Sequence, residues 1–353
     1  MRIVQLIDTL EIGGAERMAV NYANALSKTV EFSGLIATRS EGLLKEQIIK
    51  NVNYLFIDRK KVLDFKPYLS SRNYLIKNRI THIQAHSSSF FWAVLLKLTV
   101  PKIKIIWHDH YGFSENIEER SFLLLKYFSC FFTSIISVNK KLESWAKYKL
   151  LCKKNIYIPN FFDWKFTNEV VNLRGKKGKR ILHLANLRPQ KNHEFLLKIA
   201  KEIVLLHPDW SFHLVGQDTN DEYSKSIKEK IVDYNLNNNI FIYGGLSNVA
   251  EVISGCDIGI LTSISEGLPV ALLEYGAGGL PTVTTDVGEI PNFFNEKFGA
   301  IIKVTETAEF IKELNDLIQD GDKRLEKGLA FQKFVNEFFN ESEVIKKFIE
   351  FCK

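Results

Sequence analysis

Short runs of Val, Ile and Leu alternate with helix-length amphipathic segments along this chain, and the whole pattern occurs twice. In the first half, strand-like runs at residues 3–7 and 33–38 flank a helix-length segment at 15–28. The second half restarts the same order with a strand-like run at 179–186 and a helix-length segment at 193–207. Strands that alternate with helices are typical of parallel sheets with crossover helices. We therefore predict an α/β protein with two doubly wound, Rossmann-like domains.

A polar and basic stretch joins the two halves. Residues 159–180 carry too many charged and polar side chains for a core segment, and we predict a linker there. The first domain is then expected at residues 1–165 and the second at 166–335. Apolar side chains at helical spacing continue to the end of the chain. Residues 336–353 are therefore predicted to form a helix that packs back on the first domain.

The composition is that of an ordinary globular protein. Of 353 residues, 46% are hydrophobic and 25% are charged, which excludes disordered and low-complexity classes. The four cysteines have no C-x-x-C spacing, so neither a zinc knuckle nor a disulfide framework is expected, and a reducing cytoplasm is the expected compartment. The first apolar run is too short for a signal peptide. The longest, 122–138, contains Lys126 and falls short of a ~20-residue membrane span, so we predict a buried helix followed by a buried strand.

Charge is distributed unevenly between the halves. Residues 1–180 hold 30 basic and 15 acidic side chains, a net charge of +15, whereas residues 181–353 hold 17 and 26, a net charge of −9. A basic first domain indicates an anionic partner, such as a membrane surface, a phosphorylated substrate or nucleic acid. We predict no nucleic-acid partner, because no nucleic-acid-binding motif accompanies the charge.

The densest basic group is a candidate contact with an anionic membrane surface. Six lysines surround a predicted helix that also carries three large apolar side chains as candidate interfacial contacts. The lysines are Lys140, Lys141, Lys147, Lys149, Lys153 and Lys154, and the apolar residues are Leu142, Trp145 and Leu150. The alternative is a solvated helix face whose apolar side packs in the core, and the pattern does not separate the two. Membrane contact would place the protein peripherally on the inner face of the membrane.

Two glycines, Gly13 and Gly14, separate the first predicted strand from the helix that follows. Glycine at this place lets a ligand approach the backbone closely at a helix N-terminus. The fingerprint G-x-G-x-x-G is absent, which argues against a nicotinamide cofactor. A tight strand-to-helix turn without a ligand explains the glycines equally well.

Histidines follow two predicted strands of the first half. His108 and His110 flank Asp109 at the end of one strand, and His86 ends another. Ligands of open α/β sheets bind at these carboxyl ends. Metal binding by the pair is disfavoured without a clear third ligand. A hydrogen-bonding or proton-handling role at the crevice is the better functional hypothesis, and satisfied structural histidines are the alternative.

The loop at residues 186–193 follows the first predicted strand of the second half. Arg188 and Lys191 could point from this loop into a crevice and bind an anionic ligand, Arg through its planar fork and Lys as a point charge. A solvated basic loop is the alternative, and spacing alone does not exclude it.

The stretch from 262 to 276 is the most informative part of the sequence. Pro269 is well placed as the first residue of a helix, which puts Glu266 and Gly267 in the preceding loop and Glu274 near the second helical turn. Free amides at a helix start bind anions such as a pyrophosphate. Two acids beside an anion site would repel the ligand unless they bind hydroxyl groups. A nucleotide sugar satisfies both requirements.

With these motifs, the chain resembles the retaining glycosyltransferases of family 4, which have the GT-B fold of two facing Rossmann-like domains. The resemblance spans nearly the whole chain. Its most specific feature is the spacing of Glu266 and Glu274. Supporting motifs occur in the same order as in the family, at residues 13–17, 158–160, 189–193, 279–281 and 286–291.

The resemblance implies roles for individual residues. Glu266 should hold the donor sugar, Glu274 the ribose hydroxyls, and Lys191 the donor pyrophosphate. Four further residues are expected to bring their backbone close to the same donor: Gly13, Gly14, Gly267 and Leu268. The family's histidine near the reacting centre falls in the segment 108–110, where we prefer His108 over His110. The family often has an Arg five residues before the Lys; this chain has Asn186 there, so Arg188 would have to supply the second charge.

We therefore predict a metal-independent retaining glycosyltransferase that uses a UDP-sugar or GDP-sugar donor and no cofactor. The acceptor is expected to be a glycan, plausibly a lipid-linked intermediate of surface polysaccharide biosynthesis. We expect no Asp-x-Asp metal motif, so cationic side chains and a helix start would stabilise the leaving group. The alternatives are a sugar-nucleotide epimerase on the same fold and a catalytically inactive nucleotide-sugar-binding subunit. A dehydrogenase is disfavoured by the missing fingerprint.

Overall fold

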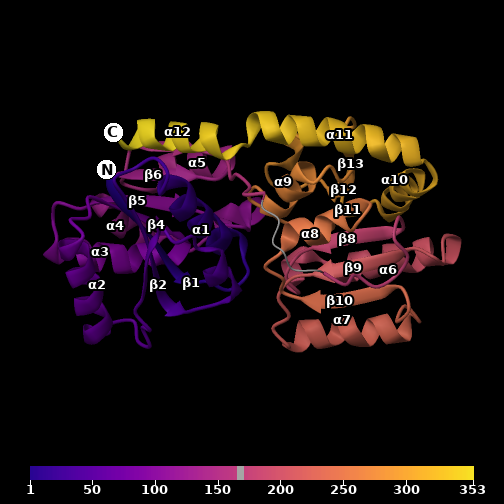
Figure 1. Ribbon diagram of the computed structural model, residues 1–353, viewed down its shortest axis with the longest axis horizontal. Helices are drawn as coiled ribbons and strands as arrows, with labels where there is room; N and C mark the ends of the chain where they lie inside the picture. Colours follow the sequence, from indigo (N-terminus) through magenta and orange to yellow (C-terminus); the bar gives the residue numbers. More distant parts are fainter. Residues whose placement is uncertain (165–170) are drawn as a thin grey trace. The chain divides into compact units, whose positions relative to one another are not determined.

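The computed structural model describes residues 1–164 and 171–353, which form two compact units (Figure 1). The first unit comprises Met1–Phe161 together with Glu341–Lys353, and the second comprises Phe162–Asn340. The predicted boundary at 165/166 falls at the edge of the undescribed residues. The predicted boundary at 335/336 lies a few residues before the end of the second unit.

The first unit is built on a parallel seven-stranded sheet with the order β3-β2-β1-β4-β5-β6-β7. Because the chain moves outward from β1 to β3 and then returns to the other side with β4, the strand order reverses between β1 and β4. The strands are β1 (Arg2–Thr9), β2 (Phe32–Ser40), β3 (Asn53–Phe56), β4 (His82–His86), β5 (Lys104–Asp109), β6 (Ser134–Ser137) and β7 (Asn155–Tyr157).

Helices cover both faces of this sheet (Figure 1). Alternate residues of β1 explain why: Val4 and Leu6 join one hydrophobic cluster, whereas Ile7 joins another with residues of α1. Strands that are buried on both faces need this two-sided apolar pattern. The helices are α1 (Gly14–Leu26), α2 (Phe65–Lys77), α3 (Phe90–Thr99), α4 (Leu123–Phe128), α5 (Lys140–Lys149) and α12 (Glu341–Cys352).

The second unit repeats the design with a parallel six-stranded sheet of order β10-β9-β8-β11-β12-β13. Its order reverses between β8 and β11. The strands are β8 (Arg180–Leu184), β9 (Ser211–Val215), β10 (Ile240–Gly244), β11 (Ile258–Leu261), β12 (Thr282–Thr285) and β13 (Gly299–Ile302). The helices are α6 (His193–Leu206), α7 (Glu222–Asp233), α8 (Val249–Ser254), α9 (Val270–Ala277), α10 (Thr307–Gln319) and α11 (Gly321–Phe338). The prediction of two doubly wound Rossmann-like domains is confirmed.

The C-terminal region is divided between the units. Helices α10 and α11 belong to the second unit, and only α12 belongs to the first. Phe348 of α12 is fully buried and packs on Tyr22 of α1 with ring centroids 5.1 Å apart. The nearly continuous helical pattern of the sequence is therefore interrupted, near Asp320 and again near Asn340.

The predicted burial of the apolar stretch 122–138 is wrong for its helix. In α4, Leu123, Leu124 and Tyr127 are all more than half exposed, and Leu125 is the buried residue. The strand that follows, β6, is buried along its whole length as predicted. Among the described residues, no helix combines the length and the apolar character that crossing a bilayer requires.

The predicted linker also contains core residues. Phe161 and Phe162 are buried, although they belong to the stretch interpreted as polar. The basic residues between Gly175 and Lys179 are exposed as expected. Residues 165–170 of the linker lie outside the described structure.

Candidate functional site

In the second unit, two loops meet where the strand order reverses. One follows β8 and carries Lys191, and the other follows β11 and carries Glu266. Adjacent parallel strands place their following loops at the same sheet edge, which is where ligands of this fold class bind. The Lys191 ammonium group lies 2.5 Å from Glu266 Oε1, and the Ser263 hydroxyl donates to the same oxygen at 2.7 Å. Glu266 is nearly buried, so its carboxylate has a fixed orientation.

Backbone and side-chain hydrogen bonds fasten these loops together. The Ile264 amide donates to the Gln190 carbonyl at 2.9 Å, and the Gln190 side-chain amide donates back to the Ser265 carbonyl at 2.8 Å. Thr262 donates its hydroxyl to the Lys191 carbonyl at 2.9 Å. The backbone around Lys191 is therefore held before any ligand arrives, which lowers the entropic cost of binding.

Two buried histidines lie near Lys191. The His183 and His193 rings meet edge to face with centroids 4.8 Å apart. Burial, reinforced by the nearby Lys191 charge, lowers the His193 pKa to about 4; burial, the other histidine and Lys191 lower the His183 pKa well below its usual value. Both imidazoles are therefore neutral near pH 7, so they add no positive charge next to Lys191.

Helix α9 begins beside the Glu266 loop. Pro269 was predicted to be its first residue but is its N-cap, and the helix starts one residue later, at Val270. The first residues of a helix have amides without intrahelical partners. Gly288 has φ +61°, and a Cβ there would stand 2.4 Å from the Glu266 carbonyl, so only glycine lets these two loops approach. Glu274 lies in the second turn and is 6% exposed.

The other predicted residues of this loop pair have different environments. The Leu268 side chain is buried in the core, so its backbone is the part that a ligand could contact. Asn186 accepts a hydrogen bond from the Gln217 amide at 2.8 Å, which fixes the loop that follows β8. Arg188 is exposed and joins no ion pair in the described part of the chain. Its guanidinium is therefore the cation that remains for an anionic ligand.

In the first unit, the loop after β1 leads into α1 through Gly13, the N-cap, and Gly14, the first helical residue. The first helical hydrogen bond runs from the Arg17 amide to the Gly13 carbonyl at 2.9 Å, so the amides of Gly14 and Ala15 precede the helical ladder. A Cβ on Gly14 would meet no atom within 4 Å, whereas one on Gly13 would stand 2.2 Å from a Glu16 carboxylate oxygen. Gly14 thus borders open space.

Three histidines gather at the carboxyl ends of β4 and β5. His86 Nδ1 lies 3.0 Å from His110 Nε2, and the His108 and His110 rings are tilted against each other with centroids 4.0 Å apart. His86 and His108 are fully buried, whereas His110 is partly exposed. Burial lowers the His110 pKa to about 3 and the pKa values of the other two well below their usual range. The structure therefore makes His110, rather than the preferred His108, the residue that a ligand can reach.

The histidine cluster has the donor atoms of a transition-metal site, since one nitrogen of each residue lies within 4.8 Å of the others. The sequence pattern alone did not identify His86 as a third partner of this pair. However, His86 Nδ1 and His110 Nε2 are hydrogen-bonded to each other, and a metal would have to replace that bond. Hydrogen bonding accounts for the contact between His86 and His110, whereas His108 Nε2 is buried without a partner among the described residues.

The comparisons with known proteins decide the family. Residues 12–165 match the family described as Glycosyltransferase Family 4, and residues 165–329 match the one described as Glycosyl transferases group 1. This chain belongs to the family 4 glycosyltransferases. The predicted resemblance to the family 4 glycosyltransferases is confirmed. Nothing in the comparisons favours an epimerase or an inactive binding subunit.

Two relatives of this glycosyltransferase align along most of their length. The UDP-Gal:alpha-D-GlcNAc-diphosphoundecaprenol alpha-1,3-galactosyltransferase of Escherichia coli is 23% identical over 362 residues, with 95% of this chain and 92% of that protein covered. The O-antigen biosynthesis glycosyltransferase WbnH of Escherichia coli is 24% identical, with 94% and 95% covered. The crystal structure of Anabaena Alr3699/HepE in complex with UDP and glucose has a TM-score of 0.80 at 14% identity, covering 99% of both chains. The GT-B fold is confirmed.

The glycosyltransferase does contain one Asp-x-Asp triplet, Asp320-Gly321-Asp322, outside the predicted donor loops. Asp320 is the N-cap of α11 and accepts a hydrogen bond from the Lys323 amide at 2.9 Å, while Asp322 lies in the first helical turn. Helix capping explains this pair of acids.

Sequence reasoning missed Arg120 of the glycosyltransferase. Its guanidinium makes a bidentate ion pair with Asp109, with distances of 2.6 and 2.9 Å, and lies over the rings of Tyr111 and Trp145. Asp109 is thereby committed to holding the loop after β5, so it is not available as an acid or base next to His110. A lone Arg eleven residues from Asp109 gave no signal in the sequence.

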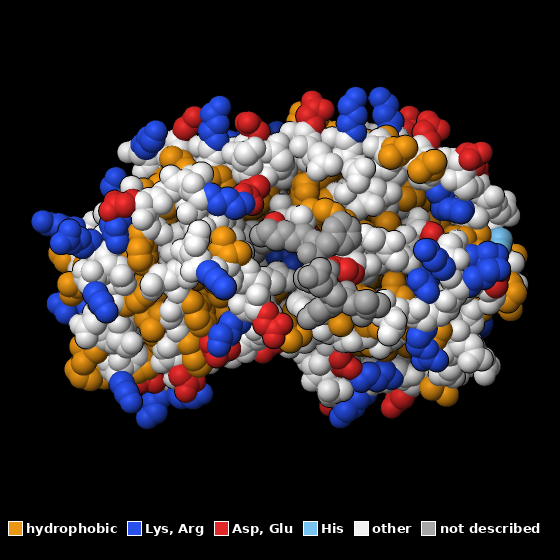
Figure 2. All heavy atoms as spheres, in the orientation of Figure 1, with side chains coloured by type: hydrophobic (Ala, Val, Ile, Leu, Met, Phe, Trp, Pro, Cys, Tyr) orange, Lys and Arg blue, Asp and Glu red, His pale blue; other side chains and the backbone are white. Residues whose placement is uncertain are grey.

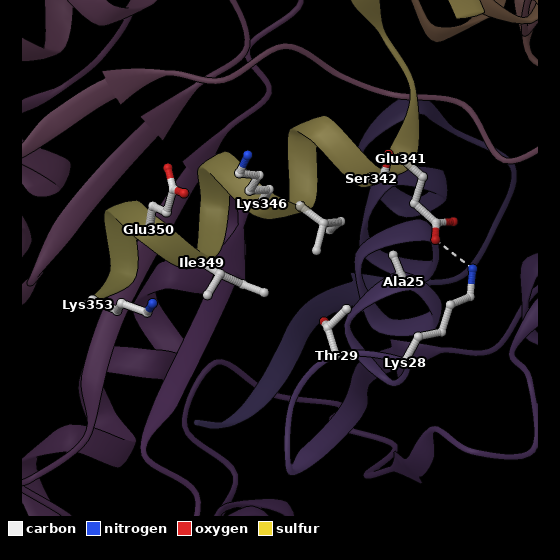
Figure 3. Close-up of a pocket in the computed structure, with 10 residues that line it drawn as sticks. Ala25, Lys28, Thr29, Glu341, Ser342, Lys346, Ile349, Glu350 and Lys353 are labelled. Atoms are coloured by element: carbon white, nitrogen blue, oxygen red, sulfur yellow. Dashed lines mark hydrogen bonds and ion pairs between the residues drawn. The ribbon is translucent and has the colours of Figure 1, made fainter.

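A groove in the first unit lies away from these loops. It runs between the C-terminal end of α1 and helix α12, has a volume of about 450 Å³, and is lined by residues such as Ala25, Ile349 and Lys346 (Figure 3). Lys28 and Glu341 form an ion pair across it at 2.5 Å. Because Gly14 is at the opposite end of α1, about 16 Å along the helix axis, the groove is separate from the glycine loop.

Proposed function

We propose that this glycosyltransferase transfers a sugar from a nucleoside-diphosphate sugar to a glycan acceptor with retention of anomeric configuration and without a metal ion. The observation that carries the proposal is the ion pair of Lys191 with the nearly buried Glu266 at the strand-order reversal of the second unit. A cation suits the diphosphate, and a fixed carboxylate suits sugar hydroxyls. Both groups are required by one nucleotide-sugar ligand, and they are already adjacent.

Binding of the donor would exchange the partners of these two residues. The Lys191 ammonium would turn from Glu266 to the diphosphate, and the Glu266 carboxylate would accept hydrogen bonds from the sugar. The exposed Arg188 and the amides at the start of α9 would add to the positive potential around the leaving group. Preorganised groups of this kind stabilise charge that develops in the transition state.

In the reaction, the bond between the anomeric carbon and the diphosphate oxygen breaks, and a bond from that carbon to the acceptor oxygen forms on the same face. The acceptor proton passes to the departing phosphate oxygen, so atoms and charges balance. No carboxylate needs to act as general acid or base. This agrees with Asp109 being held by Arg120 and with His110 remaining neutral near pH 7 because burial lowers its pKa.

We propose UDP-sugar as the donor class and a lipid-linked glycan as the acceptor class. The related Escherichia coli enzyme is named for UDP-Gal and a diphosphoundecaprenol-linked GlcNAc, and the similar Anabaena structure contains UDP. GDP-sugar is the alternative that the sequence leaves open. A lipid-linked acceptor requires the enzyme to work at a membrane surface, and we propose a cytoplasmic enzyme that binds the membrane peripherally.

The first unit carries an exposed apolar and basic surface suited to that task. Val62, Leu63 and Phe65 are 59%, 70% and 76% exposed, and Lys61 and Lys66 flank this segment. The neighbouring helices α2, α3 and α4 add further exposed apolar side chains: Leu69, Ile76, Leu98, Leu123, Leu124 and Tyr127. Figure 2 shows apolar side chains among basic ones where α2 and α3 lie.

This surface replaces the one predicted around α5. Leu142, Trp145 and Leu150 are buried in the core of the first unit, so they are not available as interfacial contacts. Of the nearby lysines, Lys141 and Lys147 form exposed ion pairs with Glu115 and Glu143. The solvated alternative that the sequence left open is therefore the better account of α5.

Product analysis tests the proposed function. The purified enzyme would be incubated with a panel of UDP- and GDP-sugars and a diphosphate-lipid-linked acceptor in the presence of excess EDTA. We expect turnover with a UDP-sugar and a product whose anomeric proton coupling matches that of the donor. An inverted product would contradict retention. Activity that EDTA abolishes and Mg²⁺ or Mn²⁺ restores would contradict metal independence.

A further inference from the structure

The histidine cluster of the first unit continues into the sheet through a buried glutamine. Gln5 of β1 and His86 of β4 are both fully buried, and they lie on adjacent strands. Gln5 Oε1 is 2.8 Å from His86 Nε2, and His86 Nδ1 is 3.0 Å from His110 Nε2. A chain of two hydrogen bonds thus runs from the sheet interior to the partly exposed His110.

The hydrogen bond between Gln5 and His86 determines which residue donates in the hydrogen bond between His86 and His110. A carbonyl oxygen only accepts, so His86 must donate its Nε2 proton to Gln5. A neutral His86 then has a lone pair on Nδ1, which accepts the Nε2 proton of His110. The Nε2 proton of His110 is therefore donated to His86, and His110 Nδ1 keeps its lone pair. That atom has no hydrogen-bond partner in the described part of the chain.

We propose that Gln5 and His86 are positioning residues that hold His110 in the Nε2–H tautomer, so that its Nδ1 accepts a hydrogen bond from a hydroxyl group of the sugar or the acceptor. The role of that hydroxyl rests on the proposed function, whereas the tautomer does not. If the Gln5 amide were turned over, both bonds would run in the opposite direction, and His110 would present an N–H group. The two directions therefore predict opposite recognition.

The neighbouring pair Gln84 and His108 provides an internal comparison. Gln84 is the β4 residue that pairs with Gln5, it is equally buried, and its Nε2 lies 2.9 Å from His108 Nδ1. His108 Nε2, in contrast to His86 Nδ1, is buried without a hydrogen-bond partner among the described residues. The hydrogen bond of Gln84 thus leads only to His108, which is too buried for a ligand to reach. Gln84 has the same chemistry and burial as Gln5 and lacks the link to His110.

Nitrogen-15 NMR of the full chain, labelled at histidine, tests the tautomer directly. We expect His110 to show a protonated Nε2 and an unprotonated Nδ1 near pH 7.5, a pattern that Gln5→Leu and His86→Phe abolish and Gln84→Leu preserves. In steady-state assays, Gln5→Leu and His86→Phe should each lower kcat at least tenfold with little change in donor KM, and His86→Gln, which keeps an acceptor for His110, should lose less than His86→Phe.

Several outcomes would overturn the proposal. A wild-type His110 protonated at Nδ1 would reverse the direction of the chain, and equal losses in Gln5→Leu and Gln84→Leu would reduce Gln5 to a structural role. A stoichiometric metal ion in the purified protein would make the three histidines a metal centre. An enzyme without transferase activity would disprove the proposed function while leaving the NMR result to decide the tautomer.

Discussion

The Lys191 ammonium group lies 2.5 Å from a carboxylate oxygen of Glu266, although the two residues are 75 positions apart in sequence. The resemblance to the family assigns them to different parts of the donor, the diphosphate and the sugar. In the structure without a donor, each neutralises the other. A donor must therefore supply the cation with phosphate and the carboxylate with hydroxyl groups at the same time, which favours a ligand that contains both.

Substitution of this pair should remove turnover. We expect Lys191→Ala and Glu266→Ala each to lower kcat by about 10² to 10³, or about 3 to 4 kcal/mol, because each removes a group that acts on the transition state. Lys230→Ala is the matched control, since it breaks the ion pair with Glu194 on the exposed surface of the same unit. Near-wild-type turnover in a folded Lys191→Ala or Glu266→Ala enzyme would remove that residue from the site.

Glu274 should act on binding rather than chemistry. If its carboxylate holds the ribose, it is remote from the bond that breaks, and Glu274→Ala should raise the donor KM with little change in kcat. Steady-state kinetics over a range of donor concentrations measure both constants. A fall in kcat at saturating donor would place Glu274 nearer to the reacting centre.

Gly14 should tolerate a side chain structurally but not functionally. A Cβ there would border open space, so Gly14→Leu is expected to unfold near the wild-type temperature and to lose donor binding. Gly276→Ala should lower stability instead, because its Cβ would stand 2.4 Å from a Val335 methyl group. It should cost about 1 to 3 kcal/mol of stability through overpacking. Full activity of Gly14→Leu would show that no ligand passes this glycine.

The exposed apolar segment at the start of α2 should mediate membrane binding. We expect the combined variant Val62→Ser, Leu63→Ser, Phe65→Ser to sediment less with anionic liposomes than the wild type, and binding to weaken with salt as basic contacts are screened. Leu205→Ser with Leu206→Ser is the control, since these side chains are 71% and 61% exposed in the second unit. Binding that is independent of lipid charge, or equal in both variants, would contradict the proposal.

Acid should destabilise the fold through its buried histidines. Burial lowers the pKa values of His193 and His213 to about 4, below the value of about 6.5 in the unfolded chain. The unfolded state thus binds more protons below pH 6.5, and stability that is complete above this pH is lost as the pH falls toward 4. Each such histidine contributes a slope of about 1.4 kcal/mol per pH unit.

Denaturant unfolding at a series of pH values tests this linkage. His213 bonds to the Ser211 and Tyr243 hydroxyls, each at 3.0 Å. His213→Asn should reduce the slope between pH 6 and 4.5 by about 1.4 kcal/mol per pH unit, because it removes one proton-binding difference. An unchanged slope would show that His213 does not contribute.

The sequence predicted the features that depend on local pattern. Strands buried on both faces appear as continuous apolar runs, so the positions of β1, β5 and β8 and the division into two sheets could be read directly. The loops after β8 and β11 could be matched to a nucleotide-sugar ligand because glycine, proline and acids recur there at fixed spacing. The pairing of Lys191 with Glu266 depends on the adjacency of two strands that the sequence separates by five elements.

Burial was the property that the sequence did not determine. The leucines of α4 look like core residues, but this short helix packs through Leu125 and leaves Leu123 and Leu124 exposed. His108 and His110 lie on the same side of an extended chain, and only the end of β5 at Asp109 makes the second one accessible. Similarly, Trp145 seemed able to reach a membrane until the core was known to contain it.

Helix α12 makes the first domain discontinuous in the chain, and this has a consequence for its biosynthesis. A ribosome that has completed residues 1–161 has made the whole seven-stranded sheet but not the helix that covers Tyr22. Phe348 and Cys352 of this helix, which are synthesised after the whole second unit, are buried in the first. The apolar face of the nascent first domain therefore stays uncovered while the second domain is translated. Loss of α12 alone would leave an aggregation-prone protein whose catalytic loops are all present.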